Sequence, residues 1–501
     1  MAEDYENLRE WGQNIIRWGV MWPGVAPTSG GVNETYLSVM RNVTDTVSEG
    51  YGIWSLIDAH QDVLAAPFCG EGAPTWAVWT GAASGAERGF PWPADAPYAV
   101  DNATGAPSPA DCAKHDWTDY YFTWAQGAAA QALYNNSGGV RDAFAASWAA
   151  VAGAFSGAPG VVGWELLNEP WAGDAIGDVG LMVFGVADRA NLQPFYDVLA
   201  AAIAGADPAG HIVLFESVTW DDVFPVGFDK TPGNFSATAL SFHYYNPPNL
   251  NAASQFAARS ADMKRLNCGG MLTEFDISGA NVAGMQETMA VADAYLGSWI
   301  GWEYKTFVEI TGYGWGPYNP DGSVNDAVVK GARVSGLLCV CVCVCVCGWV
   351  CVCVRARSEG HTRSRAALAR TYPAAVAGMT HAFTFDNATG AFNLTYALGA
   401  AATGATEVFV SLKYYYPAGI TVTAVPSGVV SWVFAPITRG APHPVSTPGQ
   451  PAARPAAGAV GFERSLARAA AGGANAGYIV VSQLPAARVG QVVQLSVVAS
   501  A

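Results

Sequence analysis

The chain has 501 residues, of which 51% are hydrophobic, 12% aromatic and 13% charged. This composition excludes an intrinsically disordered chain, and the length predicts two or three domains. The net charge of −16 excludes the basic surface typical of nucleic-acid-binding proteins, so no nucleic-acid partner is expected. The 18 Trp residues suit carbohydrate binding, because the C–H faces of sugars stack on aromatic rings, although a large core also uses Trp.

The N-terminus lacks the basic and apolar regions of a secretory signal peptide, and no apolar run approaches the roughly 18 residues that span a bilayer. Seven N-x-[ST] sequons nevertheless predict the secretory route, with the signal expected upstream of Met1. The sequon residues are Asn33, Asn42, Asn102, Asn135, Asn234, Asn387 and Asn393. We therefore expect a glycoprotein that is secreted or resides in a lysosome-like compartment.

Residues 5–330 alternate between apolar runs that end in polar residues and stretches compatible with helices. The expected strands are Asn14–Val20, Ile53–Asp62, Val161–Pro170, Ile212–Trp220, Ala239–Tyr245, Gly270–Ile277 and Trp299–Phe307. The expected helices are Glu3–Gly12, Thr35–Glu49, Asp119–Tyr134, Val140–Phe155, Leu192–Ala204 and Val282–Tyr295. Strands that alternate with helices indicate βαβ units and a parallel sheet.

Functional-looking side chains gather at the carboxyl ends of these strands, where a (β/α)₈ barrel carries its active site. The sequence therefore predicts a (β/α)₈ TIM barrel. Only seven strands are visible, so the first strand is apparently missing and is expected upstream of Met1.

Residues 371–501 lose the helical periodicity and become rich in Thr, Val, Ala, Gly and Pro. Alternating runs at His381–Asp386, Ala391–Leu398, Thr406–Leu412 and Ala474–Ser482 predict an antiparallel β-sandwich. The expected division is a catalytic barrel over residues 1–336, an insert over 337–366 and the C-terminal β-sandwich domain over 367–501.

The insert contains the low-complexity run Cys339–Cys353, in which Cys alternates with Val. Strand alternation would put the Cys side chains on one face, which leaves a soft-metal site open, but no turn gathers four ligands. A repeated TGT-GTG codon pair explains the run more simply, so we interpret residues 337–366 as an unspliced intron. No metal is expected elsewhere, because H-E-x-x-H and paired C-x-x-C motifs are absent outside the repeat.

The segment Gly163–Asp174 opens from an apolar strand into Asn168-Glu169-Pro170 and then Trp171. A carboxylic acid at the end of a strand, inside an aromatic-lined mouth, can keep the raised pKa that a general acid needs. Asn168 beside it could bind a sugar 2-hydroxyl group. A glutamate in a solvated turn is the plainer interpretation of so short a motif.

A second strand-end carboxylate comes from Met271–Ile277, where Glu274 follows the apolar run. Asp276 lies on the same face of that strand and is the local competitor. Retaining glycoside hydrolysis needs two carboxyl groups about 5–5.5 Å apart. The sequence therefore predicts Glu169 as the proton donor and Glu274 as the nucleophile.

Further polar side chains lie at the same strand ends. Each alone is compatible with a structural role, and together they favour a site; they are Arg17, His60, Asp62, His243 and Tyr245. An Arg and a Tyr near the nucleophile would keep it ionised. Trp302, on the last strand, would form the floor of a sugar subsite or fill the core.

These segments resemble glycoside hydrolase family 5 and, within it, the endoglycoceramidases. The resemblance covers nearly everything except residues 337–366. It is carried by Ile57–Val63, Phe68–Trp76, Phe90–Pro93, Asn168–Asp174, Ser241–Pro248 and Arg370–Gly378.

The resemblance implies hydrolysis of the β-glycosidic bond between glycan and ceramide in glycosphingolipids, without a cofactor. Contact with a membrane surface would come through the substrate. The resemblance also marks Glu169 as acid/base and Glu274 as nucleophile, and implies a Cys69–Cys112 disulfide. It implies a glucose subsite lined by His60, Asp62, Asn168, Tyr245 and Trp302, with Arg17 and His243 in support.

Other functions remain open. A family 5 β-glucosidase or endoglucanase would act on glucosylceramide, steryl glucosides or β-glucan, and a non-catalytic glycolipid-binding protein is an alternative of another class. A lipid-accepting site needs an apolar shelf beside the mouth. We expect that shelf from Phe68–Trp79 and Leu181–Phe184.

Overall fold

The computed structural model describes residues 2–500, except residues 79–88, 221, 236, 247, 279–280, 306–315, 320–322, 326–327, 330–367, 400–403, 439, 441–462, 467–473 and 485–486. The Cys-Val insert therefore lies outside the described residues, and its interpretation stays a prediction. The two domain boundaries at its ends, 336/337 and 366/367, also stay predictions. No helix in the described part of the chain is long and apolar enough to cross a membrane.

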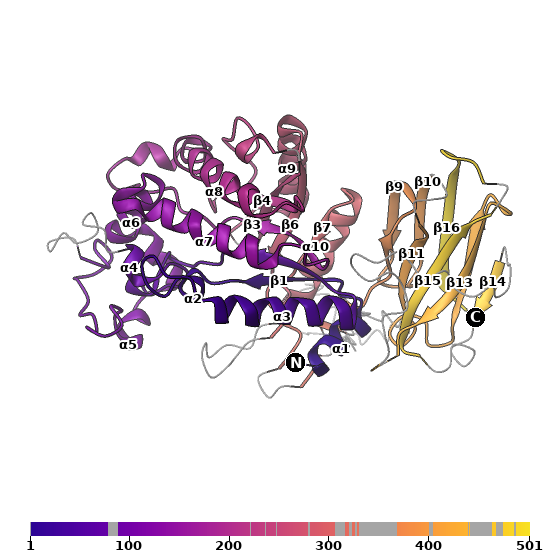
Figure 1. The fold of residues 1–501 in the computed structure, drawn as a ribbon. Coiled ribbons are helices and arrows are strands. Elements are labelled where there is room, and N and C mark those ends of the chain that lie inside the picture. Colours follow the sequence, from indigo (N-terminus) through magenta and orange to yellow (C-terminus); the bar gives the residue numbers. More distant parts are fainter. Residues whose placement is uncertain are drawn as a thin grey trace, which may run out of the picture.

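A seven-stranded parallel sheet forms the N-terminal part, with its strands in chain order (Figure 1). The strands are β1 (Ile15–Gly19), β2 (Trp54–Asp58), β3 (Val161–Glu165), β4 (Ile212–Glu216), β5 (Thr238–Tyr244), β6 (Gly269–Phe275) and β7 (Ser298–Trp299). Each lies inside or within one residue of a predicted strand. The predicted parallel (β/α) architecture is confirmed.

Helices cover this sheet (Figure 1). They are α1 (Ala2–Trp11), α2 (Trp22–Val25), α3 (Glu34–Tyr51), α4 (Thr75–Val78), α5 (Pro109–Cys112), α6 (Trp124–Tyr134), α7 (Val140–Phe155), α8 (Gln193–Ala206), α9 (Ala252–Leu266) and α10 (Val282–Ala294). Asn33, Asn251 and Asn281 cap α3, α9 and α10 by accepting backbone N–H groups in the first turn.

Besides the short helices α2, α4 and α5, which were not predicted, two longer helices differ from the sequence prediction. The predicted helix Asp119–Tyr134 is split, because Thr123 is extended and separates the 3₁₀ turn Trp117–Phe122 from α6. Helix α9 was not predicted; most of its apolar residues are Ala, and charged residues interrupt their spacing. Its inner face buries Arg259 and Asp262 beside Phe256, and such a paired charge does not register in a search for apolar periodicity.

The parallel sheet is open between β1 and β7, which are its two edge strands within the described residues. A cavity of about 1370 Å³ lies there, bounded by both edges and by residues that precede and follow the Cys-Val insert. Its wall includes Ile16 and Trp18 of β1 and Trp299 of β7, and Arg17 and Trp302 also contribute to it. The arrangement is a curled half-barrel of TIM-barrel type.

The C-terminal part is a sandwich of two antiparallel sheets, as predicted. Its strands are β8 (Tyr372–Ala375), β9 (Gly378–Phe385), β10 (Phe392–Leu398), β11 (Thr406–Ser411), β12 (Ile420–Val425), β13 (Val430–Pro436), β14 (Glu463–Leu466), β15 (Ala476–Gln483) and β16 (Val492–Ala499). The sheets have the orders β14-β12-β16-β10-β9 and β13-β15-β11-β8. The strands predicted from the sequence correspond to β9, β10, β11 and β15, and the other five were not predicted.

The sandwich lies at the end of the molecule away from α4, α5 and α6 (Figure 1). Polar contacts join it to the barrel: Lys413 Nζ lies 3.0 Å from Glu10 Oε1 on α1, and Arg370 pairs with Asp293 on α10. Tyr372 donates its hydroxyl to the Gly12 carbonyl. These contacts place the sandwich against α1 and α10.

Candidate active site

The polar residues predicted from strand ends all meet at the carboxyl edge of the parallel sheet. Arg17 lies on β1, His60 and Asp62 follow β2, Asn168 and Glu169 follow β3. His243 lies on β5, Tyr245 directly follows it, Glu274 lies on β6, and Trp302 follows β7. Because parallel strands end at one edge, residues spread over nearly 300 positions form one cluster.

Arg17 is the hub of this cluster, with only 4% of its side chain exposed. Its guanidinium lies 2.5 Å from Glu165 Oε2, 3.1 Å from Asp58 Oδ1 and 3.1 Å from Glu274 Oε2, and it donates to Asn168 Oδ1 at 2.7 Å. Burial opposes its charge, but the three carboxylates outweigh burial and raise the pKa of Arg17 well above its usual range. One buried cation thus links β1, β2, β3 and β6.

The two predicted catalytic carboxylates face each other across the mouth. Oxygen atoms of Glu169 and Glu274 and a ring nitrogen of His243 all lie within 4.8 Å of one another. So close an approach of the two carboxylates is compatible with the retaining geometry, in which the carboxyl groups lie about 5–5.5 Å apart. Glu274 also accepts the Tyr245 hydroxyl at 2.7 Å.

Asp276, the local competitor of Glu274, serves a turn instead. Its Oδ1 accepts the Ser278 N–H at 2.7 Å, and its backbone pairs with Trp302. Glu274 alone of the two contacts Arg17 and Tyr245. The geometry therefore favours Glu274 over Asp276 as the nucleophile.

The backbone at Glu169 is strained and held from several sides. Its φ of +39° is unusual for a residue with a side chain. Gln61 donates its amide to the carbonyls of Asn168 and Glu169, at 2.7 and 2.8 Å. The Glu169 N–H donates to Glu216 Oε2 at 2.8 Å. These buried partners fix the direction in which the carboxyl group points.

His243 controls the charges around Glu169. Its Nδ1 lies 2.8 Å from Glu169 Oε1 and 3.6 Å from Glu216 Oε1. Burial would lower the pKa of His243, but the charges of Glu216 and Glu274 and the hydrogen bond to Glu169 raise it to about 10. Burial would raise the pKa of Glu169, but His243 lowers it. In the unliganded protein the proton therefore lies on His243.

Glu216 and Glu274 are shifted the opposite way. Burial raises the pKa of Glu216 to about 8, and the charges of Glu169 and Glu165 add to this rise against the opposing charge of His243. Burial also raises the pKa of Glu274, while the charges of His243 and Arg17 oppose the rise. Glu216 thus holds its proton to a higher pH than an ordinary carboxyl group, and Glu274 depends on its cationic neighbours to ionise.

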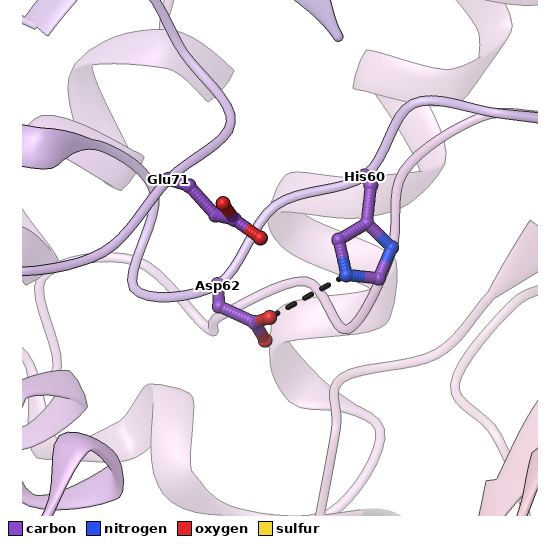
Figure 2. A group of neighbouring side chains, drawn as sticks. All are labelled: His60, Asp62 and Glu71. Carbon is purple, nitrogen blue, oxygen red and sulfur yellow. Dashed lines mark ion pairs between the residues drawn. The ribbon is translucent and has the colours of Figure 1, made fainter. Parts of the chain in front are cut away.

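Three side chains form a second polar group beside this centre (Figure 2). His60 bonds Asp58 Oδ2 through Nδ1 at 2.8 Å, and its Nε2 lies 3.4 Å from Asp62 Oδ2. Burial would lower the pKa of His60, but both carboxylates raise it well above its usual value. Glu71 faces the pair because the backbones of Asp62 and Glu71 form a β-bridge.

Trp302 lies parallel to the His60 ring, with ring centroids 5.0 Å apart and planes within 1°. A cationic imidazole against an aromatic face is a favourable contact. The structure thus brings Trp302 to the site, as predicted, and gives it a partner on β2's side of the mouth.

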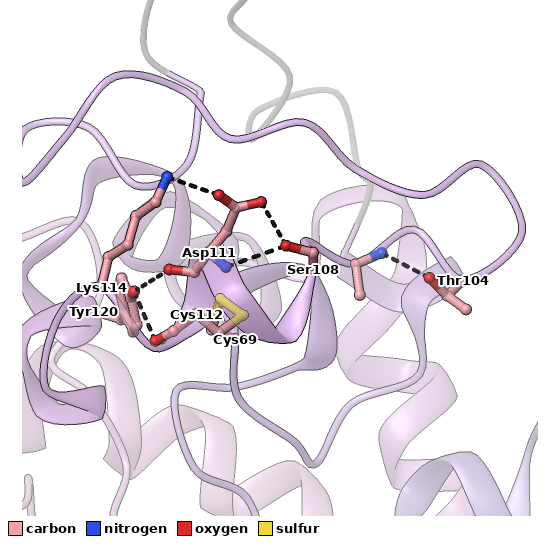
Figure 3. The surroundings of a disulfide bond; sticks show 8 residues. Cys69, Thr104, Ser108, Asp111, Cys112, Lys114 and Tyr120 are labelled. Atoms are coloured by element: carbon pink, nitrogen blue, oxygen red, sulfur yellow. Dashed lines mark hydrogen bonds and ion pairs between the residues drawn. A yellow bond between two sulfur atoms is a disulfide. The ribbon is translucent and has the colours of Figure 1, made fainter.

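A disulfide fixes the loop that carries Glu71 (Figure 3). Cys69 and Cys112 are bonded, which confirms the pairing implied by the resemblance. Around it, Asp111 pairs with Lys114 at 2.7 Å, and the Tyr120 hydroxyl donates to the Cys112 carbonyl at 3.0 Å. The covalent link holds residues 69–71 beside the end of β2.

The apolar shelf expected from Phe68–Trp79 and Leu181–Phe184 is wrong in part. Phe68, Ala77 and Val78 are buried in the core, so these residues form no outward apolar shelf. Phe184, from the other predicted shelf segment, is 43% exposed. Phe68 is buried because its ring packs against that of Phe90, with ring centroids 5.7 Å apart.

Three carboxylates of the site were not predicted: Glu71, Glu165 and Glu216. Asp58, Glu165 and Glu216 are the last residues of their strands, and they point inward to buried cations. A charged residue closing each of three consecutive apolar strands was the available signal. Glu71 lies in a loop, and only tertiary pairing with Asp62 reveals it.

Either polar group could present ligands to a cation, as His60, Asp62 and Glu71 or as Glu169, His243 and Glu274. In the second group Glu169 is bonded to His243 and Glu274 to Arg17 and Tyr245. The side chains there compensate each other's charge. The arrangement can donate a proton from one side and present a carboxylate from the other.

Comparison with known proteins agrees with this geometry. Residues 1–307 match the family description "Cellulase (glycosyl hydrolase family 5)", and residues 370–451 match "Glycoside hydrolase family 5 C-terminal domain". The chain belongs to glycosyl hydrolase family 5. The catalytic match covers the barrel, and the C-terminal domain match begins in the β-sandwich.

Among curated family 5 relatives, an endoglycoceramidase of Cyanea nozakii is 39% identical over 439 residues, covering 86% of this chain and 79% of the relative. An endoglycoceramidase of Hydra vulgaris is 38% identical over 421 residues, covering 83% of this chain and 73% of the relative. Within family 5, the chain groups with the endoglycoceramidases.

A solved structure of endo-glycoceramidase II from Rhodococcus sp., in complex with a five-membered iminocyclitol, has the same fold. Its TM-score is 0.67 at 18% sequence identity, over 100% of this chain and 92% of that chain.

Replacing the hub tests its structural role. We expect Arg17→Met to lower the free energy of unfolding by about 3–5 kcal/mol, because it leaves Glu165 and Asp58 buried without their cation. Urea unfolding measures this loss. Arg189→Met is the control, since its exposed guanidinium pairs with exposed Asp229, and we expect no measurable change. Equal effects of the two substitutions would contradict the hub.

The pKa values near 8 and 10 predict how stability depends on pH. The folded protein holds protons on Glu216 and His243 that the unfolded chain releases at about pH 4.3 and 6.5. Their contribution is complete below the unfolded values and is lost as pH rises through 8 and 10. The Tm should therefore fall as pH rises from about 6 to about 10.

Glu216→Gln should make this fall shallower, most clearly below pH 8, because the amide cannot release a proton. Differential scanning calorimetry at several pH values measures the slope. Glu49→Gln, at an exposed position of α3, is the control for charge. An unchanged slope in Glu216→Gln would show that Glu216 does not titrate in this range.

Proposed function

We propose that this protein is a retaining glycosidase that hydrolyses the β-glycosidic bond between glycan and ceramide in glycosphingolipids. The observation that carries the proposal is the Glu169–Glu274 pair, with oxygens within 4.8 Å, in a chain 39% identical to an endoglycoceramidase. The first point supports the reaction type, and the second supports the substrate class.

In the first step Glu274 attacks the anomeric carbon of the sugar next to ceramide. The C–O bond to ceramide breaks, and the proton of Glu169 passes to the leaving oxygen. In the second step Glu169, now ionised, removes a proton from water, and the water oxygen displaces Glu274. Two inversions give net retention, with ceramide and a free glycan as products.

His243 supplies the acid form of Glu169 in this account. Its Nδ1 proton lies on a 2.8 Å hydrogen bond to Glu169 Oε1, so one short transfer protonates the carboxyl group. Arg17 and Tyr245 direct hydrogen bonds to the two oxygens of Glu274 and keep it ionised and aimed. The acid and the nucleophile thus differ in charge because their partners differ.

The remaining predicted residues suit the sugar. Asp62 presents a carboxylate that is 28% exposed. Asn168, directly before Glu169 in the loop after β3, is oriented by Arg17 and Gln61. The stacked pair of His60 and Trp302 offers an aromatic face to the sugar ring. These residues would hold the sugar attached to ceramide.

The alternatives fit less well. An endoglucanase or a glucosidase shares the carboxylate pair, but the relatives that cover most of the chain are endoglycoceramidases. A non-catalytic binding protein would not require both carboxylates with their buried partners in a retaining geometry. The exposed Phe184 beside the mouth favours an apolar aglycone.

We also propose a secreted or lysosome-like location. The Cys69–Cys112 disulfide is typical of oxidising compartments. Four sequon asparagines are exposed on the structure, Asn42, Asn102, Asn135 and Asn393. Both observations support N-glycosylation on the secretory route.

Chemical rescue tests the two roles separately. Glu274→Ala should release no glycan, and added azide should restore turnover as the α-glycosyl azide, because azide takes the place of the nucleophile. Glu169→Ala should lower the hydrolysis rate of substrates with poor leaving groups about 10²–10⁴-fold. With this variant, added azide should give the β-glycosyl azide. NMR of the products distinguishes the two.

Asp276→Asn is the matched control on the same face of the chain and should keep most of the activity. Wild-type-like turnover by either glutamate variant would contradict the assignment. Release of free glycan from other β-glucosides, but not from glycosphingolipids, would leave the mechanism intact and overturn the substrate.

A further inference from the structure

Glu216 closes β4 and reaches the backbone of Glu169 across the space between two strand ends. The β3–β4 ladder pairs Glu165 with Leu214, and the Leu166 N–H donates to the Leu214 carbonyl at 3.1 Å. Three residues later the Glu169 N–H donates to a side chain instead, Glu216 Oε2, at 2.8 Å. The carboxyl group of Glu216 thus extends the contact between the two strands beyond their backbone ladder.

A side-chain acceptor is needed there because the backbone of Glu169 is left-handed. With a φ of +39°, Glu169 has left the extended conformation in which a strand pairs with its neighbour through backbone groups. A residue with a side chain keeps such a φ only where its surroundings hold it on several sides. The Gln61 amide holds the carbonyl of Glu169, and Glu216 holds the N–H. Glu216 is itself anchored, since its carbonyl accepts the Tyr196 hydroxyl at 2.9 Å.

Glu216 also reaches the partner of the Glu169 side chain. Its other oxygen, Oε1, lies 3.6 Å from His243 Nδ1, the nitrogen that lies 2.8 Å from Glu169 Oε1. Only 5% of the Glu216 side chain is exposed, so bulk water has little access to its oxygens. One buried carboxyl group thus faces both the backbone of the proposed acid and the histidine that bonds its side chain.

We propose that Glu216 is a positioning residue, which holds Glu169 where it can protonate the leaving oxygen and later deprotonate water. The inference rests on the proposed function. Glu216 performs no step of its own in that mechanism, because its oxygens are directed at Glu169 and His243. Displacement of a reacting group by about 1 Å can cost about 10²-fold in rate, so a hydrogen bond that fixes the acid matters to catalysis.

The length and the charge of the side chain at position 216 can be varied separately. Glu216→Asp keeps the carboxylate but loses one methylene group, so its oxygens lie too far from the Glu169 N–H to accept it. Glu216→Gln keeps the length and an acceptor oxygen and removes the ionisable group. A positioning role predicts that Glu216→Gln is the milder change, whereas a role through charge predicts the opposite.

The leaving group reports whether the acid is in place. A methylphenyl glycoside has a poor leaving group and needs the proton of Glu169, whereas a dinitrophenyl group leaves without it. We expect Glu216→Asp to lower kcat/KM about 10²-fold for the methylphenyl glycoside and less than about threefold for the dinitrophenyl glycoside. Glu216→Gln should lose less than about tenfold on either substrate, because its amide oxygen still accepts the Glu169 N–H.

Azide gives a second readout, of the step in which Glu169 acts as base. The kcat of Glu216→Asp on the dinitrophenyl glycoside should be low, because water then lacks a well-placed base. Added azide needs no base, so it should raise kcat and give the β-glycosyl azide. A purely structural defect would lower all rates alike and would not respond to azide.

Asp188→Asn is the matched control. Asp188 is buried, and its two oxygens accept the N–H groups of Val218 and Gly227, at 2.9 and 2.7 Å. The substitution therefore also removes an acceptor from a backbone N–H, but not from that of Glu169. It should change kcat/KM for the two glycosides by the same factor.

Equal losses of Glu216→Asp on the two glycosides would overturn the inference and leave the proposed function standing. So would a Glu216→Gln variant that is as impaired as Glu216→Asp on the methylphenyl glycoside. If the wild-type chain cleaves neither these glycosides nor a glycosphingolipid, the proposed function fails, and the inference fails with it.

Discussion

The site depends on one buried cation among buried carboxylates. Arg17 reaches groups on three other elements, and burying so many charges is tolerable only where each is paired. The same pairing fixes the relative positions of the strand ends, since Arg17 contacts both Asn168, next to the proposed acid, and Glu274, the proposed nucleophile. Structure and chemistry therefore share a single network.

The network also separates the two glutamates by charge. Glu169 bonds a histidine that can carry a proton, whereas Glu274 bonds an arginine that always does and a tyrosine hydroxyl. Glu216 completes the arrangement by accepting the Glu169 N–H, and burial raises the pKa of its carboxyl group. Two like carboxyl groups with oxygens within 4.8 Å of each other thus acquire different roles from their neighbours.

Much of this could be predicted from the sequence, for a physical reason. In a parallel sheet, strand ends meet at one edge, so an apolar run followed by Asn168-Glu169 or by Glu274 locates a side chain without knowledge of tertiary structure. Glu165 and Glu216 were not predicted, because a carboxylate that ends an apolar strand acquires a function only through its distant partner. Helix α9 was not predicted for a similar reason. Arg259 and Asp262 are buried only because they pair with each other. The loop residue Glu71 depends on a disulfide and a β-bridge, neither of which local patterns reveal.

The central claim is that Glu274 forms the covalent bond to the sugar. A 2-deoxy-2-fluoro β-glycoside with a good leaving group should trap that bond, because the fluorine slows both steps and the leaving group speeds only the first. Mass spectrometry of the digested protein should find the glycosyl adduct on the peptide with Glu274. An adduct on Asp276, Asp62 or Glu216, or a product of inverted configuration without any adduct, would contradict the account.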